Sequence, residues 1–196
     1  QWRQAVQAYL ASISFVDECV GRVVDALDKS DYATNTIIIL WSDHGWHLGE
    51  KLHWRKFALW EEATHNVMMC LAPGVTQPGG RCEASVNLLD IYPTLLDLAG
   101  LAPKKENEGQ SLVPLLKNPN APRDKPALTT HGRNNHTIRS RRWRYIRYAD
   151  GSEELYDHEN DEMEWTNLAN DPDYADVIAE HKKWLPMVNV EESPRE

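Results

Sequence analysis

The sequence predicts an α/β fold with a small antiparallel subdomain at its C-terminal end. A long amphipathic helical pattern is followed by a short, continuous apolar run, which is the order of helix and buried strand in an α/β protein. A second apolar run and then a second helical pattern follow. Beyond a connection rich in proline, the pattern changes to alternation around a hairpin turn, which indicates antiparallel strands.

The first helix is predicted over residues 3–29. Apolar residues recur there at steps of three and four, which places them on one face of a helix: Val6, Leu10, Ile13, Val16, Val20, Val23 and Leu27. Polar residues 30–35 connect this helix to residues 36–41, which read T-I-I-I-L-W. Because this run is short, continuous and β-branched, we expect a central parallel strand that is buried on both faces.

The next elements are a strand, a helix and a long connection. Residues 67–71, V-M-M-C-L, predict a second buried strand. A helix is predicted to begin at Asp90, a suitable N-cap, and to end at Gly100. Residues 102–126 read as a connection, so we divide the chain into an α/β part, 1–126, and a small C-terminal subdomain, 127–196.

The C-terminal subdomain is predicted to contain a β-hairpin and a terminal helix. Residues 143–148 alternate as W-R-Y-I-R-Y, Asp150-Gly151 is a hairpin turn signal, and residues 154–156 form the returning strand. An amphipathic helix is predicted over residues 173–185. Since alternate residues of a hairpin face solvent, we expect solvent exposure of a basic run; contact with an anionic glycan is the alternative for these residues, Arg139, Arg141, Arg142, Arg144 and Arg147.

Composition excludes several classes of protein. The 196 residues carry a net charge of −9, which argues against a dedicated nucleic-acid binder, and no apolar run is long enough to span a membrane. Cys19, Cys70 and Cys82 form no C-x-x-C pair, so a structural zinc site is not expected. We expect small buried cysteines and leave a Cys70–Cys82 disulfide open. The polar start without Met leads us to expect that the chain begins inside a longer reading frame.

The strongest chemical signal is Ser42-Asp43-His44-Gly45, which directly follows the first predicted strand. Ligands of open α/β sheets gather at the carboxyl ends of the strands. Asp and His side chains at such an end are suited to hold a metal ion. The alternative is a loop Asp that caps the next element beside a surface His.

The residues from Asp43 to Lys56 read D-H-G-W-H-L-G-E-K-L-H-W-R-K. The pattern D-H-G-x-x-x-G-E…W-x-K after a buried strand resembles the second signature of the type I sulfatases, most closely the iduronate-2-sulfatase-like branch. Other pieces agree in order along nearly the whole chain: A-T-H at 63–65, A-P-G at 72–74, D-I-Y-P-T at 90–94 and E-L-Y-D at 154–157. The resemblance implies a sandwich like that of alkaline phosphatase, with residues 1–126 as the C-terminal part of its α/β domain.

The resemblance also implies the roles of three residues. Asp43 and His44 match the ligands of one divalent metal ion, usually calcium. Many similar proteins have Asn in place of His44, and since calcium prefers oxygen donors, the identity of the metal stays open. Lys56 matches a lysine that holds a sulfate oxygen, where a fixed ammonium would stabilise the charge that builds up on the leaving oxygen. A solvated surface lysine is the alternative for Lys56.

Five other side chains are candidate contacts for the substrate. Lys51 and His53 share the loop with the lysine of the W-x-K motif. His65 is a candidate proton donor or partner of the metal site, and a buried structural histidine is an equal alternative. His131 and Arg133 follow the long connection, where proteins of the family often build the rim of the substrate site.

The type I sulfatases use a formylglycine that is made from the Cys of a C-x-(P/A)-x-R motif, and none of the three cysteines here stands in such a motif. We therefore expect the nucleophile in an N-terminal half that is absent from this chain. The whole protein would hydrolyse sulfate esters of a sulfated sugar, in a secreted, periplasmic or lysosomal-type location, and this chain alone would be inactive. A phosphatase or phosphodiesterase of the same superfamily and a non-catalytic glycan-binding piece are the alternatives.

Overall fold

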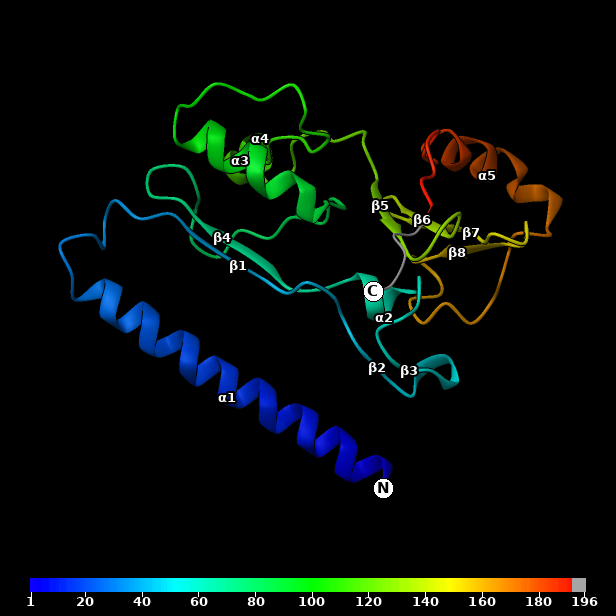
Figure 1. Ribbon diagram of the computed structural model, residues 1–196, viewed down its shortest axis with the longest axis horizontal. Helices are drawn as coiled ribbons and strands as arrows, with labels where there is room; N and C mark the ends of the chain where they lie inside the picture. The colour runs from blue at the N-terminus through cyan, green and yellow to red at the C-terminus, as the bar shows by residue number, and fades with distance from the viewer. Residues whose placement is uncertain (192–196) are drawn as a thin grey trace.

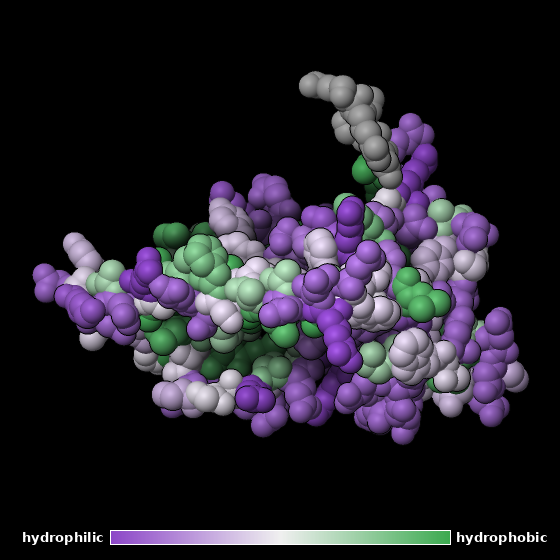
Figure 2. All heavy atoms as spheres, turned by 90° about the horizontal axis from the view of Figure 1, so that it is seen from below, coloured by the Kyte–Doolittle hydropathy of each residue, from purple (hydrophilic) through white to green (hydrophobic). Residues whose placement is uncertain are grey.

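The computed structural model describes residues 1–191, and its longest element is the helix α1, Trp2–Asp28 (Figure 1). This helix confirms the prediction for residues 3–29. No residue of α1 is buried within the described part of the chain. Leu10, Ile13 and Val16 of the predicted apolar face are exposed, and Figure 2, which views the molecule from the side of α1, shows hydrophobic side chains at that surface. The middle of the apolar stripe of α1 is therefore open within residues 1–191, whereas its first turns contact the chain elsewhere: Trp2 lies edge-on against Trp54 with ring centres 5.4 Å apart.

The two predicted apolar strands pair with each other. Strand β1, Ile38–Trp41, and strand β4, Met68–Leu71, form a two-stranded antiparallel sheet in which Ile38 lies opposite Leu71. The expectation of a central parallel strand buried on both faces is wrong for β1 in the described structure, because its partner is antiparallel and Trp41 is exposed. A continuous apolar run indicates burial, but it carries no information about the direction of the neighbouring strand.

A short hairpin and one helical turn lie between β1 and β4 in the chain. The strands β2, His47–Leu48, and β3, Trp54–Arg55, are joined through the 3-10 turn η1, Glu50–Leu52. His47 pairs with Arg55, so the hairpin returns the chain to its starting point. Helix α2, Glu61–Thr64, then leads into β4. In Figure 1 the hairpin lies below α2, on the side away from the C-terminal sheet.

The helix predicted from Asp90 to Gly100 is present as α3, Ile91–Leu98, preceded by the 3-10 turn η2, Leu88–Asp90. Asp90 does not cap α3 through its side chain, contrary to the prediction. Its buried carboxylate instead accepts hydrogen bonds from the Asn87 backbone N–H at 2.9 Å, from the Gln110 N–H at 2.7 Å and from Arg123 at 2.6 Å. Asp90 thereby fastens the long connection to α3. That connection also contains a short helix, α4, Val113–Lys117.

The C-terminal part is a four-stranded antiparallel sheet in the order β5-β6-β7-β8. The predicted hairpin is confirmed as β7, Trp143–Arg147, and β8, Glu153–Asp157, and two further strands extend it, β5, Ala127–Thr130, and β6, His136–Arg139. The predicted terminal helix is the 3-10 turn η3, Pro172–Tyr174, followed by α5, Ala175–Lys182.

Both faces of this sheet are covered. On one face Ile138, Tyr145 and Leu155 form a buried cluster with Ile178 of α5. On the other face Ile146 and Tyr156 form a second buried cluster with Leu59, which precedes α2. The second cluster joins the C-terminal sheet to the segment that follows the β2–β3 hairpin.

The expectation that the basic run is exposed is wrong for Arg144, whose side chain is 1% exposed. The prediction assumed that one face of the hairpin meets solvent, whereas Leu59 and α2 cover the face on which Arg144 lies. Arg142 instead pairs with Asp157 at 2.6 Å. The arginines of this run are therefore partners of carboxylates rather than a free basic surface.

The structure tests the expectations about the cysteines and about a membrane span. Cys19, Cys70 and Cys82 are free thiols, so the Cys70–Cys82 bond that the sequence left open is not formed. Cys19 and Cys82 are exposed, which corrects the expectation that the cysteines are buried. Within residues 1–191, none of the helices has the length and apolar character needed to cross a membrane.

Candidate active site

The loop that carries Asp43 and His44 begins directly after β1 and is fastened at three points. The Ser42 backbone N–H donates to the Val67 carbonyl at 3.1 Å, and the Ser42 hydroxyl donates to the His44 carbonyl at 2.8 Å. The Gly45 N–H donates to the Ala63 carbonyl of α2 at 2.9 Å. These bonds hold the end of β1 against the segment that leads into β4.

Gly45 is the point of closest approach in this loop. A Cβ atom built at Gly45 would overlap the backbone carbonyl of Glu62 and would come within 3.0 Å of the His65 carbonyl oxygen. Backbone atoms cannot move aside as a flexible side chain can, so the position requires a residue without a side chain. Gly45 therefore sets the distance between the Asp43–His44 loop and α2.

Asp43 and His44 present two donor atoms that fit one divalent ion. His44 Nδ1 lies 2.7 Å from the Gly45 carbonyl oxygen, which can only accept, so Nδ1 donates this bond and Nε2 is the ring nitrogen available to a metal ion. Nε2 lies 3.5 Å from Asp43 Oδ2, and the Asp43 side chain is 79% exposed. Two ligand atoms at that separation can share an ion at usual bond lengths of about 2.0–2.6 Å. A mixed nitrogen and oxygen pair suits several divalent metals.

Lys56 follows β3 immediately, and the β2–β3 hairpin returns it toward Trp46, the last residue of the Asp43–Trp46 loop. Because His47 pairs with Arg55 in an antiparallel hairpin, Lys56, the residue after Arg55, lies near Trp46, the residue before His47. The Lys56 ammonium lies 5.6 Å from the centre of the Phe57 ring. It has no ion pair with a carboxylate among the described residues. An unpaired ammonium at this place is a suitable contact for an anion.

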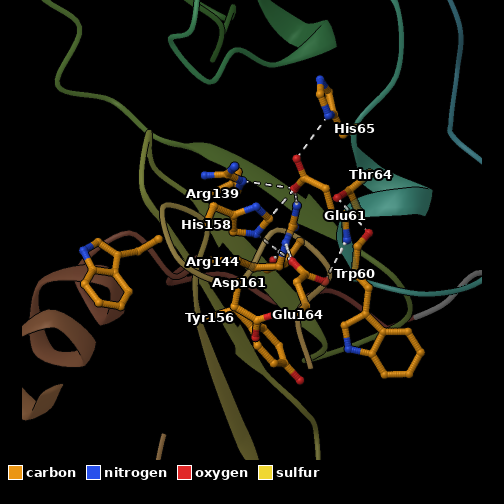
Figure 3. Close-up of polar contacts among 12 residues, drawn as sticks. Trp60, Glu61, Thr64, His65, Arg139, Arg144, Tyr156, His158, Asp161 and Glu164 are labelled. Atoms are coloured by element: carbon orange, nitrogen blue, oxygen red, sulfur yellow. Dashed lines mark hydrogen bonds and ion pairs between the residues drawn. The ribbon is translucent and has the colours of Figure 1, made fainter. Parts of the chain in front are cut away.

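His65 lies at the same end of the β1–β4 pair as the Asp43–His44 loop. Since the two strands are antiparallel, the residues after the end of β1 and before the start of β4 are neighbours. His65 is exposed, and its Nδ1 lies 3.1 Å from Glu61 Oε1 (Figure 3). The hydrogen bond to Glu61 raises the pKa of His65 above its usual value, although partial burial opposes the rise. His65 is therefore an exposed histidine bonded to Glu61, and the buried alternative does not describe it.

The other two predicted residues of the loop turn toward the protein. The Lys51 ammonium lies between two aromatic rings, 4.6 Å from the centre of Tyr156 and 5.0 Å from the centre of Trp60. His53 stacks edge-on against His47 with ring centres 4.8 Å apart, and the buried Nε2 atoms of both histidines have no hydrogen-bond partner among the described residues. Burial, followed by the charge of His53, lowers the pKa of His47.

His131 and Arg133 lie in the turn between β5 and β6. The His131 ring centre is 5.7 Å from that of Phe57, so the structure brings this turn next to the residue that follows Lys56. Arg133 instead pairs with Glu191 at 2.9 Å. Of these two predicted substrate contacts, His131 lies beside Phe57, the residue after Lys56, and Arg133 is paired with Glu191.

A buried charged cluster near α2 was not predicted from the sequence (Figure 3). Arg144 donates to the carboxylates of both Glu61 and Glu164, and His158 Nε2 lies 2.9 Å from Glu164 Oε1. The donor atoms of Glu61, His158 and Glu164 lie within 4.8 Å of one another, as in a metal site. The Arg144 guanidinium already supplies the positive charge between these carboxylates, so the geometry is that of an ion-pair cluster rather than of a metal site.

The two carboxylates of this cluster are held in their charged form. Burial alone would raise the pKa of Glu61, but the hydrogen bond with His65 and the charges of Arg144 and Arg139 hold that pKa well below its usual range. Burial would likewise raise the pKa of Glu164, but the hydrogen bond from His158 and the charge of Arg144 outweigh burial, so the pKa of Glu164 is lowered. No sequence signal announces the cluster, because Glu61 and Glu164 are far apart along the chain.

Comparison with known proteins connects this chain to one family. The family model described as Sulfatase matches residues 1–101. A protein named sulfatase from Formosa agariphila is 47% identical over 189 residues, which is 96% of this chain and 37% of that protein. A choline-sulfatase of Rhizobium meliloti is 35% identical over 87% of this chain and 34% of its own length. A Δ4,5-hexuronate-2-O-sulfatase of Bacteroides thetaiotaomicron is 32% identical over 90% of this chain and 40% of its own length.

Solved structures show the same likeness. A structure described as a 2-O GAG sulfatase has a TM-score of 0.83 and 29% identity over 93% of this chain and 42% of its own. A structure in complex with its substrate D-glucosamine-2-N,6-O-disulfate has a TM-score of 0.76 and 29% identity over 89% of this chain and 38% of its own. A phosphonate monoester hydrolase of Agrobacterium radiobacter has a TM-score of 0.77 and 30% identity over 87% of this chain and 38% of its own. The chain thus spans well under half the length of these proteins.

Proposed function

Because the chain belongs to the sulfatase family, we propose that it carries the metal-binding and sulfate-binding part of an enzyme that hydrolyses sulfate esters. The observation that supports this most is the pairing of the Asp43 carboxylate with the free Nε2 of His44 at the end of β1, on a loop toward which the hairpin returns Lys56. The finer assignment to the iduronate-2-sulfatase-like branch is part of the proposal and rests on the D-H-G…W-x-K pattern.

The residues of this chain have separate tasks in the proposed reaction. Asp43 and His44 would hold one divalent ion, calcium in our proposal, which when bound would neutralise charge on the sulfate oxygens. Lys56 would hold the oxygen that joins sulfur to the substrate, where negative charge develops as the S–O bond breaks. His65, paired with Glu61, would contact the anionic substrate from the β4 side.

The nucleophile belongs to residues outside this chain in our proposal. No cysteine of the chain stands in a C-x-(P/A)-x-R motif, so a formylglycine would come from the part that the longer relatives have in addition. The 196 residues alone would then be inactive. Purified chain that turns over 4-nitrophenyl sulfate, and loses that turnover when Lys56 is replaced, would contradict this.

A sulfated sugar is the substrate class that we propose. One similar protein is named a Δ4,5-hexuronate-2-O-sulfatase, and one similar structure is a complex with its substrate D-glucosamine-2-N,6-O-disulfate. Choline-sulfatase is a relative with a different small substrate, so the family alone does not decide the class. The likeness to a phosphonate monoester hydrolase favours a second candidate, a phosphoryl or phosphonyl ester hydrolase.

The deciding experiment compares substrates and one matched pair of variants in the whole enzyme. The enzyme should hydrolyse a 2-O-sulfated hexuronate or a sulfated glucosamine faster than a phosphonate monoester. Asp43→Ala should lose bound metal and turnover together, whereas Asp31→Ala, at an exposed position before β1, should keep both. Faster hydrolysis of the phosphonate would favour the second candidate, and unchanged metal content in Asp43→Ala would contradict the proposed site.

A further inference from the structure

The loop between β2 and Lys56 has an unusual backbone. Lys51, Leu52 and Arg55 have positive φ angles of 50°, 57° and 76°, although none of them is glycine. Side chains with a Cβ atom disfavour this region, so such residues persist where the surrounding structure holds them. The tip of the loop does not supply that support, because Leu52 is 94% exposed. The restraint must come from other contacts of the loop.

The Lys51 side chain supplies one such contact. Its ammonium lies between the rings of Trp60 and Tyr156, donates to the Tyr156 hydroxyl at 3.3 Å and donates to the Glu164 backbone carbonyl. The Tyr156 hydroxyl in turn donates to Glu154 at 2.8 Å. An ammonium between two aromatic faces, with oxygen acceptors beside it, is a favourable and directional arrangement. Lys51 thus connects the strained loop to β8 of the C-terminal sheet.

The other end of the same segment is held by the buried cluster. The Glu164 carboxylate accepts the Glu61 backbone N–H at 3.0 Å and also pairs with Arg144. Arg144 donates to the Leu59 carbonyl at 3.1 Å. Arg144 and Glu164 are each 1% exposed. Residues 59–61 are therefore fixed to the C-terminal sheet, as Lys51 is, and Lys56 lies between the two fixed points.

We infer that Lys51 is a positioning residue: through Tyr156 and Glu164, the C-terminal sheet holds the strained loop and sets the place of the Lys56 ammonium. This inference rests on the proposed function, in which Lys56 contacts the sulfate. It assigns to Lys51 a task other than contact with the substrate. The C-terminal sheet is then part of the support of the site, although none of its strands carries a proposed metal ligand.

The kinetic test compares three variants of the whole enzyme. Lys51→Met keeps the length of the side chain but removes its charge, and kcat for 4-nitrophenyl sulfate should fall about 10-fold to 100-fold, because a displacement of about 1 Å in a positioned group has such effects. KM should change by less than about threefold. Lys51→Arg should restore most of kcat. The matched control is Lys104→Met, since Lys104 also lies over an aromatic ring, that of Tyr92, at 5.5 Å, away from the loop.

The second measurement is independent of any activity. The amides of Leu52 and His53 donate to Gly49 and Glu50 within the loop, and their hydrogen exchange reports how firmly the loop is held. In Lys51→Met these two amides should exchange at least about tenfold faster, while the amides of β6 and β7 keep their rates and show that the fold is intact. Tyr156→Phe, which keeps the ring and removes the hydroxyl acceptor, should give a smaller change in the same direction.

The outcomes separate the two proposals. Unchanged exchange of the Leu52 and His53 amides in Lys51→Met would overturn the positioning role, whatever the enzyme hydrolyses. Faster exchange with unchanged kcat in an active enzyme would overturn it as well. If the wild-type enzyme hydrolyses no sulfate ester, the proposed function fails, and the exchange measurement still decides whether Lys51 holds the loop.

Discussion

At the scale of single residues, the site depends on one position where a side chain cannot fit. Gly45 brings the Asp43–His44 loop against the carbonyl of Glu62, and any Cβ atom there would force the loop away from α2. Displacing the loop would also break the Gly45 N–H bond to Ala63. The geometry of Asp43 and His44, the two proposed metal ligands, is thus coupled to the packing of α2.

Gly45→Ala should therefore lower the metal content of the whole enzyme, measured by elemental analysis, and destabilise it by roughly 1–3 kcal/mol through forced overpacking. Gly21→Ala is the control, because Gly21 lies within α1 and a Cβ there meets nothing within 4 Å. The control should keep its metal and gain about 0.5–1 kcal/mol from helix propensity. Equal metal content in both variants would show that the close approach is not needed.

Lys56→Ala tests the most important side chain for the proposed chemistry. Loss of one preorganised contact to developing charge costs roughly 10²–10³ in rate, or about 3–4 kcal/mol. The proposed metal ligands, Asp43 and His44, are untouched, so the metal content should stay the same. Stability should change by less than about 0.5 kcal/mol, because the residue lies on a loop. Lys105→Ala, an exposed lysine far along the chain, should keep the wild-type rate. A loss below about threefold in Lys56→Ala would contradict the proposed role.

Sequence reasoning could locate the Asp43–His44 loop because a buried strand followed by Asp-His is a local pattern. It could not find the partners of Glu61, since Arg144 and Glu164 become neighbours of Glu61 through folding alone. The same limit explains the error for Arg144. Alternation along β7 predicts which residues share a face, but it does not reveal that a distant segment covers that face.

At the scale of elements, the contact between α2 and the C-terminal sheet is a charged one that should respond to acid. The folded-state pKa values of Glu61 and Glu164 are lowered, so the unfolded chain binds more protons near its carboxyl pKa of about 4.3. Their contribution to stability is therefore present above that pH and is lost as the pH falls toward the lowered folded-state values.

Urea unfolding at several pH values between 7 and 3 measures this contribution. The free energy of unfolding should decrease below about pH 4.3, and the decrease should be smaller in Glu164→Gln, which removes one of the two carboxyl groups. Glu106→Gln, at an exposed position, should keep the wild-type slope. Identical slopes in wild type and Glu164→Gln would show that the buried cluster does not control the acid response.

The C-terminal sheet itself is held by apolar packing on the α5 side. Leu155 is 0% exposed and lies in the cluster with Ile138 and Tyr145, so Leu155→Ala should destabilise the protein by roughly 2–5 kcal/mol. Leu128 on the edge strand β5 is 36% exposed, and Leu128→Ala should cost clearly less. Chemical denaturation of the two variants checks the order, and equal losses would contradict the assigned core.

At the scale of the whole molecule, the sequence predicted the α/β class and the separate antiparallel sheet, and the comparisons with sulfatase structures confirm that fold. The direction of β1 relative to its neighbour was not predictable, because apolar character reports burial and not pairing. The exposure of Leu10, Ile13 and Val16 on α1 was not predictable either, because an apolar pattern does not identify the segment that packs against it. These three side chains lie on the apolar stripe of α1, and periodicity identified the stripe without showing which segment would cover it.

The most direct test of the central claim is an experimental structure of the whole enzyme with its metal and a bound sulfate. The account predicts one divalent ion bound by the Asp43 carboxylate and by His44 Nε2, with the Lys56 ammonium within about 3 Å of a sulfate oxygen. Lys51 should remain between Trp60 and Tyr156. An ion bound by neither Asp43 nor His44, or a sulfate bound away from Lys56, would contradict the account.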